Sequence, residues 1–590
     1  MTNSFFARFD KRLAYRRENK MASAKEAVQK VEARSTLHLA VTHSVPFGLA
    51  FELTRAFWRT MPRFELITLG ASVNIQVMLR DPGFLRKLIT SYAGNVYPSP
   101  SPASVFQENY RTGEVPIENW SLLTLVQRLM AGALSLPFLP TNSLGLSGME
   151  TENTGSSVAR ILNPFEQKEQ IVLSALVPDY TLVHGWAADP SGNVLARAPR
   201  TESNFGVLSA RKGVIASVDR IVDYEYVQNH HEDLLVPASR TIAVVHMPYG
   251  AHPSPCRGYP PEWGYAEDEK FLLEFRKASK EMTNLDAWAK RWVLEINHEK
   301  YLSDLGSTRL DSLVKAASPD AWKKDFERRK ADIDFSAPPL PTEQMIIAMA
   351  KMCVDRVLEK GYRTVLAGQG TSNLAAWVAD YQLAEKGIDV DLMAEIGFYG
   401  YTPLPPQPLI FNFANIATCT GVMSTLDILG IHVTGARSKE CIGMLGAAII
   451  DKYGNVDSTC VPEMRSWLVG SGGANDVLSG AEEVIVCCPQ EVQRLWPQVP
   501  YVTGPGNKVS TLVTTQGIFR KPSIDSPFRL MSVFTPPEDP EKSTDSIVAH
   551  IVENTGWDVE KFDEVNRLPL PEPDVLHLLR AFDPGRYYLH

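Results

Sequence analysis

The sequence predicts an α/β protein made of two similar halves, and three observations support this fold class. Apolar segments of strand length alternate with helical segments along the chain. A short turn motif occurs once in each half. Residues 318 to 341 are highly charged and then rich in proline, which is the composition of a linker. We therefore expect one domain at residues 1 to 317, including an N-terminal extension, and a second at residues 342 to 590.

Individual segments illustrate the alternation. TIAVVHMP at residues 241 to 248 and EEVIVCC at residues 482 to 488 are apolar and β-branched, so we expect strands there. TEQMIIAMAKMCVDRVLEKG at residues 342 to 361 has the apolar spacing of a helix. Strands flanked by helices in this way are typical of layered α/β domains.

The repeated motif is Asp-x-x-Gly-Asn-Val. It occurs in GWAADPSGNV at residues 185 to 194 and in GAAIIDKYGNV at residues 446 to 456, each time after an apolar, strand-like run. Gly and Asn suit the positive φ of a turn, and the Asp can accept hydrogen bonds from turn amides. The shared context favours a duplication, with the two turns at equivalent positions.

Composition excludes several classes of protein. Of 590 residues, 44% are hydrophobic and 22% charged, as in globular proteins with more than one domain. The net charge of -9 offers no basic face for nucleic acid. No apolar run is long enough for a membrane span, and the N-terminal residues lack the apolar core of a signal peptide. They are arginine-rich, like a transit peptide, but Asp10 and Glu18 argue against one. A cytoplasmic protein is expected.

The cysteines give no sign of a metal site. There are seven, and no pair has CxxC spacing, so neither a disulfide framework nor a zinc site is indicated. We expect reduced, mostly buried thiols and no bound metal.

One glutamate stands in an apolar segment. Glu395 lies within DVDLMAEIGFYG at residues 389 to 400, and an ionised carboxylate in apolar surroundings costs several kcal/mol unless it is paired. Either its head group reaches solvent at a strand end, or it is a catalytic carboxylate with a shifted pKa. This segment alone leaves both interpretations open.

Two glycine-rich loops lie in the same half. GQGTSNLAAWVADY at residues 368 to 381 and GSGGANDVLSGA at residues 470 to 481 each follow a strand-like segment and lead into a helical one. Backbone amides at such junctions can hold a phosphate or an oxyanion, although the glycines could also serve only tight turns. Neither loop has the Gly-Lys-Ser/Thr ending of a P-loop, and one GxG is a weak dinucleotide signal, so an ATPase or dehydrogenase is disfavoured.

With these segments assembled, the chain resembles the family I CoA-transferases of the glutaconate type, with α-like and β-like subunits fused in one chain. In the first half the resemblance is carried by NPFEQKEQIVLSALVPDYTLVHGWAADPSGNV, PYGAHPSPCRG and WVLEINHEKYLSDLGSTRL. In the second half it is carried by GQGTSN, AEIGFYG, LGAAIIDKYGNVDST, GSGGAND and VTGPGNKVSTLVTTQGIF, in the order that the β-like half requires. The resemblance implies two CoA-transferase-type α/β domains in tandem.

The resemblance also implies a mechanism. Glu395, in the Glu-x-Gly motif of the β-like half, would carry the acyl group as an anhydride and then CoA as a glutamyl thioester. Gly472, Gly473 and Asn475 would form the oxyanion and CoA loop, and Gly368, Gly370 and Gly397 would contact CoA. The substrates would be an acyl-CoA and a small carboxylic acid, with coenzyme A as a substrate and no tightly bound cofactor. A homodimer is expected.

The chain departs from the family pattern in three places. Ala40-Val41 replaces a glycine turn, Ile449 replaces a glutamine, and Val96-Tyr97 stands where a glutaconate carboxylate anchor is expected, so the substrate pocket should differ. Because a fold does not fix its chemistry, an acyl-CoA hydrolase, a ring-opening hydrolase and an inactive CoA-binding homologue stay open as alternatives. A decarboxylase of the same fold would call for a different residue at Glu395.

Overall fold

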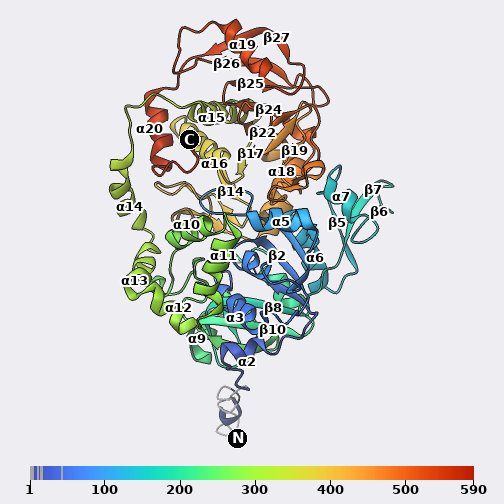
Figure 1. Cartoon of the computed structure of the whole chain (residues 1–590), viewed down its shortest axis with the longest axis vertical. Helices are drawn as coiled ribbons and strands as arrows, with labels where there is room; N and C mark the ends of the chain where they lie inside the picture. Colours follow the sequence, from blue (N-terminus) through green and yellow to red (C-terminus); the bar gives the residue numbers. More distant parts are fainter. Residues whose placement is uncertain (1–5, 10–11, 13–17, 41–43, 590) are drawn as a thin grey trace.

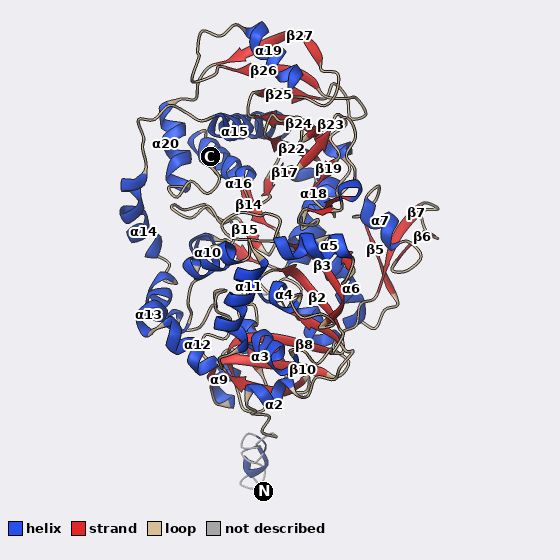
Figure 2. Cartoon of the chain, in the orientation of Figure 1, coloured by secondary structure: helices blue, strands red, loops and turns tan. Residues whose placement is uncertain are grey.

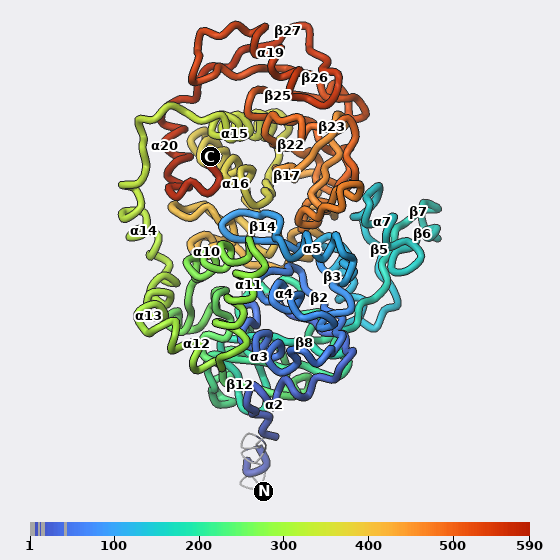
Figure 3. Tube along the Cα trace, viewed as in Figure 1, coloured from blue at the N-terminus to red at the C-terminus, as the bar shows by residue number. Residues whose placement is uncertain are grey.

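The computed structural model describes residues 6–9, 12, 18–40 and 44–589 and places two α/β units one above the other along its longest axis (Figure 1). The first unit lies at the bottom of this view. Figure 3 follows the chain up the left side, through a green run of helices, into the second unit. The tandem arrangement predicted from the sequence is confirmed.

The first unit is built on a sheet whose parallel strands follow the order β12-β10-β8-β1-β2-β3-β4. A short antiparallel pair, β9 and β11, extends from β8. The strands are β1 (Thr36–Leu39), β2 (Phe64–Ala71), β3 (Leu85–Ala93), β4 (Ile117–Asn119), β8 (Tyr180–Ala188), β9 (Val194–Leu195), β10 (Gly213–Ile221), β11 (Leu234–Val236) and β12 (Thr241–His246). A separate small sheet contains β5 (Phe138–Thr141), β6 (Val158–Leu162) and β7 (Glu169–Ser174).

The second unit repeats the same arrangement. Its parallel strands follow the order β14-β13-β17-β22-β24, which corresponds to β2-β1-β8-β10-β12 of the first unit. Antiparallel strands β15 and β16 extend one edge, and β25, β26 and β27 extend the other. The strands are β13 (Thr364–Ala367), β14 (Asp391–Ala394), β15 (Phe398–Tyr399), β16 (Gly421–Val422), β17 (Cys441–Gly446), β22 (Glu483–Cys488), β24 (Val509–Thr514), β25 (Gly517–Arg520), β26 (Arg529–Phe534) and β27 (Glu560–Leu568).

Short strands beside the second sheet complete the unit. They are β18 (Ile449–Asp451), β19 (Val456–Asp457), β20 (Cys460–Val461), β21 (Ser466–Trp467) and β23 (Leu495–Trp496). In both central sheets the first strand of the unit has the second strand on one side and, on the other, a strand from later in the chain, β8 or β17. Ligands of such open α/β sheets bind beyond the carboxyl ends of the strands, where the order reverses.

Helices cover the faces of both sheets (Figure 2). In the first unit they are α2 (Ala24–Val28), α3 (Phe47–Phe57), α4 (Val73–Met78), α5 (Ser104–Thr112), α6 (Leu122–Ala133), α7 (Gly148–Asn153), α8 (Ser203–Ser209) and α9 (Tyr224–Asn229). The connecting run contains α10 (Glu269–Ala278), α11 (Met282–Ala289), α12 (His298–Leu305), α13 (Ser307–Ala316) and α14 (Ala321–Arg329). The second unit adds α15 (Pro341–Lys360), α16 (Thr371–Glu385), α17 (Phe413–Thr418), α18 (Ala474–Gly480), α19 (Thr544–Glu553) and α20 (Pro573–Phe582).

The sequence patterns explain these elements. All nine residues of β8 are buried, as expected for a parallel strand covered on both faces. Helix α15 begins at Pro341, where a missing N–H costs nothing, and is followed by Gly361 at φ 72°, a left-handed cap. The strands expected at residues 241 to 248 and 482 to 488 are β12 and β22.

The two predicted turns have the same hydrogen bonds. Asp189 Oδ1 accepts the amides of Ser191 and Asn193 at 2.9 and 3.0 Å. In the second unit Asp451 Oδ1 accepts the amides of Tyr453 and Asn455 at 2.9 and 3.0 Å. Gly192 and Gly454 have φ of 97° and 84°. Each turn joins two antiparallel strands, β8 to β9 in the first unit and β18 to β19, directly after β17, in the second. Because β8 and β17 occupy the same place in the two strand orders, the turns lie at equivalent positions.

The charged segment between the units is helical. Helix α14 lies within residues 318 to 341 and has no buried residue. The domain limits at residues 317 and 342 stay predictions. Within the described part of the chain, none of the helices combines the length and apolarity that a bilayer crossing needs.

Candidate active site

A cavity of about 1490 Å³ lies between the two units and is lined by both. Glu395 and Gly472 reach it from the second unit, and Leu69 and Gly70 reach it from the end of β2. Helices α10, α13 and α14 form its outer wall. Most small-molecule sites have volumes of about 300–1,000 Å³, so this cavity has room for a long ligand.

Glu395 lies in a tight reversal between β14 and β15. The two strands pair antiparallel, with Ala394 opposite Phe398. Gly397 has φ 126°, and a Cβ there would lie 2.2 Å from the carbonyl oxygen of Met423. The Gly397 N–H donates to Ala394 O at 2.9 Å. Gly397 therefore shapes the turn that presents Glu395, and it does not line the cavity.

The carboxylate of Glu395 rests against the glycine loop of α18. The Gly473 N–H donates to it, and a Cβ on Gly473 would lie 2.1 Å from Oε2. The side chain of Leu122 is adjacent, with Cδ1 3.5 Å from the same point. Only glycine at position 473 allows the carboxylate to reach this amide.

Two effects shift the ionisation of Glu395. Burial is the larger, and with the charge of Asp476 it raises the pKa of Glu395 to about 7, against the Gly473 hydrogen bond that lowers it. Burial also raises the pKa of Asp476 to about 6. Glu395 therefore ionises near neutral pH, as a more basic carboxylate than an ordinary glutamate.

The glycine loop is held by the first unit. Leu122 N–H donates to Gly472 O at 3.0 Å, and Gly472 N–H donates to Ser91 O at 2.8 Å. Ser121 Oγ donates to Asp476 Oδ1 at 2.6 Å, and Leu123 N–H donates to Oδ2 at 3.0 Å. Both units are thus needed to place Glu395.

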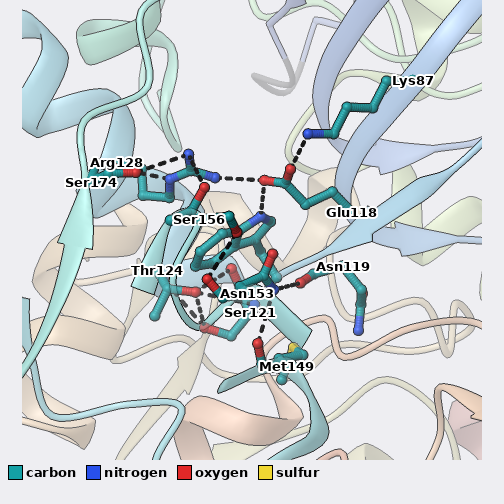
Figure 4. Close-up of polar contacts among 12 residues, drawn as sticks. Lys87, Glu118, Asn119, Ser121, Thr124, Arg128, Met149, Asn153, Ser156 and Ser174 are labelled. Carbon is teal, nitrogen blue, oxygen red and sulfur yellow. Dashed lines mark hydrogen bonds and ion pairs between the residues drawn. The ribbon is translucent and has the colours of Figure 1, made fainter. Parts of the chain in front are cut away.

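A polar network fixes the segment of the first unit that makes these contacts (Figure 4). Glu118 lies between Lys87 and Arg128, which donates to its Oε1 at 2.8 Å. The Arg128 guanidinium also stacks over the ring of Trp120, 4.3 Å from its centre. Desolvation raises the pKa of Glu118, but the charges of Arg128 and Lys87 have the larger combined effect, so the pKa is lowered. This charged group anchors the end of β4 just before Ser121.

The other predicted residues have different surroundings. Asn475 is fully buried, and its amide links Leu144 N–H, at 2.9 Å, to Thr503 O, also at 2.9 Å. Its side chain therefore joins the units. The amide of Gly472 is occupied by Ser91 O, which leaves Gly473 as the loop glycine that bonds the carboxylate.

The first glycine loop contributes Gln369 to the cavity, a residue that sequence reasoning missed. Gly370 has φ 126° and caps the N-terminus of α16, and a Cβ there would meet open space. Gly368 packs near Leu445. Between them, Gln369 lines the cavity and donates to the hydroxyl of Tyr588, which itself donates to Pro98 O at 2.8 Å. No local pattern marks Tyr588, because its role depends on a contact across the chain.

Basic side chains on the connecting helices also went unnoticed in the sequence. Lys270, Lys315 and Lys324 line the outer wall of the cavity. Among the residues that the structure describes, none of the three forms an ion pair. Neighbouring Arg309 and Arg329, in contrast, are paired with Asp268 and Glu269.

The departures from the family pattern fall in different places. Val41 lies outside the described residues, and Ala40 is buried directly after β1. Ile449 packs in a small apolar cluster with Val461 and Val499. Val96 and Tyr97 line the cavity and bring no charge into it.

Comparisons with known proteins agree with this architecture. The coenzyme A transferase family model matches residues 22–246. The A subunit of glutaconate CoA-transferase from Acidaminococcus fermentans is 29% identical over 315 residues, 50% of this chain and 94% of the relative. The B subunit of the same enzyme is 26% identical over 254 residues, 39% of this chain and 90% of the relative.

A solved structure covers both units. The acyl-CoA transferase YdiF of Escherichia coli O157:H7, crystallised as a thioester complex with CoA, aligns with a TM-score of 0.63 at 14% identity. The alignment covers 95% of this chain and 97% of that one. At this identity it shows the shared fold.

The coenzyme A transferase family model thus matches the first half of the chain, and both halves are similar to CoA-transferase subunits. The first half resembles the A subunit of glutaconate CoA-transferase and the second half the B subunit, joined in one chain as in YdiF. The resemblance predicted from the sequence is confirmed.

Proposed function

We propose that this protein transfers CoA from an acyl-CoA to a carboxylic acid, with Glu395 as the covalent carrier. The observation that carries the proposal is the Glu395 carboxylate, which faces the cavity, bonds to the Gly473 amide and has a pKa of about 7. A desolvated carboxylate is a stronger nucleophile than one in water.

The first half-reaction has two steps. A Glu395 oxygen attacks the thioester carbonyl, the carbon–sulfur bond breaks, and CoA leaves as a thiolate, which gives a mixed anhydride between Glu395 and the acyl group. The thiolate then attacks the Glu395 carbonyl carbon, the anhydride carbon–oxygen bond breaks, and the donor acid leaves as a carboxylate. Glu395 now holds CoA as a thioester.

The second half-reaction runs in reverse with the acceptor acid. Its carboxylate attacks the glutamyl thioester carbonyl, the carbon–sulfur bond breaks, and the CoA thiolate leaves, which forms a new mixed anhydride between Glu395 and the acceptor. The thiolate then attacks the acceptor carbonyl, which gives the new acyl-CoA and restores the Glu395 carboxylate. No water is consumed in either half.

Gly473 has a role in this chemistry. When thiolate attacks the Glu395 carbonyl, negative charge develops on the glutamyl oxygen, and the amide that holds the carboxylate is in place to donate to it. One such donor contributes about 3–4 kcal/mol in comparable sites. The Gly472 amide, which donates to Ser91 O, is not assigned this role.

The cavity also indicates the substrate class. Around Glu395 it is lined by apolar side chains of both units, including Leu69, Val73, Leu122 and Ile396. We assign this part to the acyl group and expect apolar acids to be preferred over dicarboxylates such as glutaconate. The unpaired lysines of the outer wall suit the phosphates of CoA. Gly368 and Gly370 stay proposed CoA contacts, and a homodimer in the cytoplasm stays a prediction.

The test replaces Glu395 by Gln, which keeps the size and removes the nucleophile. We expect Glu395→Gln to lose at least about 10³-fold in acyl exchange while still binding CoA. Asp380→Asn is the matched control, because burial raises the pKa of Asp380 to about 7 as well, and this residue lies outside the cavity lining.

Two results would contradict the proposal. Folded Glu395→Gln protein that binds CoA and exchanges acyl groups at the original rate would exclude Glu395 as the carrier. Hydrolysis of acyl-CoA by the unaltered protein, without exchange in the presence of any acid, would favour a hydrolase in which Glu395 acts as a general base.

A further inference from the structure

Three potential metal ligands meet inside the first unit, away from Glu395. His184 is on β8, Asp219 is on β10, and Cys256 is in the loop after β12. One ligand atom from each residue lies within 4.8 Å of the other two. His184 and Cys256 have no exposed surface, and Asp219 is 8% exposed.

The polar atoms of this cluster are incompletely satisfied. Among the described residues, His184 Nε2 and Asp219 Oδ2 have no hydrogen-bond partner. Nε2 lies 3.4 Å from Asp219 Oδ1, beyond the usual N–H···O range of about 2.7–3.2 Å. A buried polar atom without a partner costs about 1–3 kcal/mol.

The second nitrogen of His184 suggests which tautomer is present. Nδ1 lies 2.9 Å from Ser217 Oγ. If Nδ1–H donates to this hydroxyl, the lone pair of Nε2 faces the lone pairs of the Asp219 carboxylate. Two acceptors facing each other in a buried site are stabilised by a cation between them.

The spacing of His184 and Asp219 fits a tetrahedral zinc ion. Zn²⁺ binds histidine nitrogen and carboxylate oxygen at about 2.0–2.2 Å, so two such ligands at the tetrahedral angle are about 3.3–3.5 Å apart. The observed 3.4 Å agrees. Tyr249 N–H donates to Asp219 Oδ1 at 2.6 Å, and Ser217 holds His184, as second partners commonly do around metal ligands.

We propose that His184, Asp219 and Cys256 bind one Zn²⁺ ion. The thiol proton of Cys256 is released to solvent as its sulfur coordinates the metal. A water molecule would take the fourth position, supplied from a neighbouring cavity of about 320 Å³ that Asp219 and Tyr265 line. The CxxC spacing sought in the sequence is absent because each ligand comes from a different strand or loop.

The position of the cluster indicates a structural role. Ser254 and Pro255, directly before Cys256, line the large cavity. A zinc ion would tie this loop to β8 and β10 and so fix one wall of the catalytic cavity. The inference does not depend on the proposed CoA transfer.

The experiment measures metal in the full-length protein. Protein expressed with zinc and then dialysed should contain about one zinc per chain by plasma mass spectrometry. Replacement of the bound zinc by Co²⁺ should give a thiolate-to-cobalt charge-transfer band in the near ultraviolet. Cys256→Ser should abolish this band, and Cys256→Ser and His184→Gln should each weaken metal binding by at least about 10–100-fold. Cys353→Ser, at a buried thiol of the second unit, is the matched control and should keep the band.

Either of two results would overturn the inference. One is unaltered protein that holds no stoichiometric zinc and gives no charge-transfer band with Co²⁺, which would leave a hydrogen-bonded cluster only. The other is a band that persists in Cys256→Ser. If the variants fail to fold, the cobalt spectrum of the unaltered protein still decides the question.

Discussion

Gly473→Ala tests the geometry at Glu395 with a single methyl group. Gly473 has φ -84° and ψ 0°, values that alanine adopts without strain. The added Cβ would lie 2.1 Å from Glu395 Oε2, whereas ordinary contacts begin at 3.4 Å, so the carboxylate must withdraw by about 1.3 Å. Leu122 Cδ1 lies 3.5 Å from the same Cβ position.

This withdrawal should separate Glu395 from the Gly473 amide. A displacement of about 1 Å in a catalytic group can cost about 10²-fold in rate, so we expect that loss in kcat with little change in KM for acyl-CoA. The assay follows acyl exchange between an acyl-CoA and a labelled acid by chromatography. Gly421→Ala is the control, because its Cβ would find its nearest neighbour at 3.5 Å. Folded Gly473→Ala protein with the original kcat would refute the reasoning.

Three further predictions follow from the charges. Burial raises the pKa of Glu395 from 4.5 to about 7. Between pH 4.5 and pH 7 the folded protein therefore keeps a proton on Glu395 that the unfolded chain has lost, and the free energy of unfolding falls as the pH rises. Relative to Glu395→Gln, the unaltered protein should therefore lose up to about 3 kcal/mol of unfolding free energy between pH 4 and pH 8 in denaturant titrations. Asp476→Asn removes the neighbouring charge, so the rise of kcat with pH should move to lower pH; an unchanged profile would contradict this coupling. Lys324→Ala should weaken CoA binding about threefold by calorimetry and leave acyl-pantetheine unaffected, whereas Lys323→Ala, outside the cavity lining, should change neither.

Local patterns predicted the elements and the central residue. The strand segments, the helix predicted at residues 342 to 361 and both Asp-x-x-Gly-Asn-Val turns depend on neighbours in sequence, and the structure contains them. Glu395 stood out because a carboxylate in an apolar segment needs an explanation. The resemblance then supplied a role for it that the residues alone left open.

Contacts across the chain could not be predicted. The bonds from Ser121 to Asp476 and from Tyr588 to Pro98 join residues hundreds of positions apart. The same limitation affected the glycine loop, where Asn475 is used between the units and the amide of Gly472 is occupied by Ser91. Contacts from the first unit decide which amide of the loop can bond Glu395, and the sequence of the loop alone does not show these contacts.

The central claim is that Glu395 carries CoA covalently, and mass spectrometry tests it most directly. The protein is incubated with an acyl-CoA without acceptor acid, digested, and the peptide that contains Glu395 is analysed. The account predicts that this peptide gains the mass of CoA as a thioester, that hydroxylamine removes it, and that Glu395→Gln protein never acquires it. Continued acyl exchange by a protein whose Glu395 peptide stays unmodified at every time point would contradict the account.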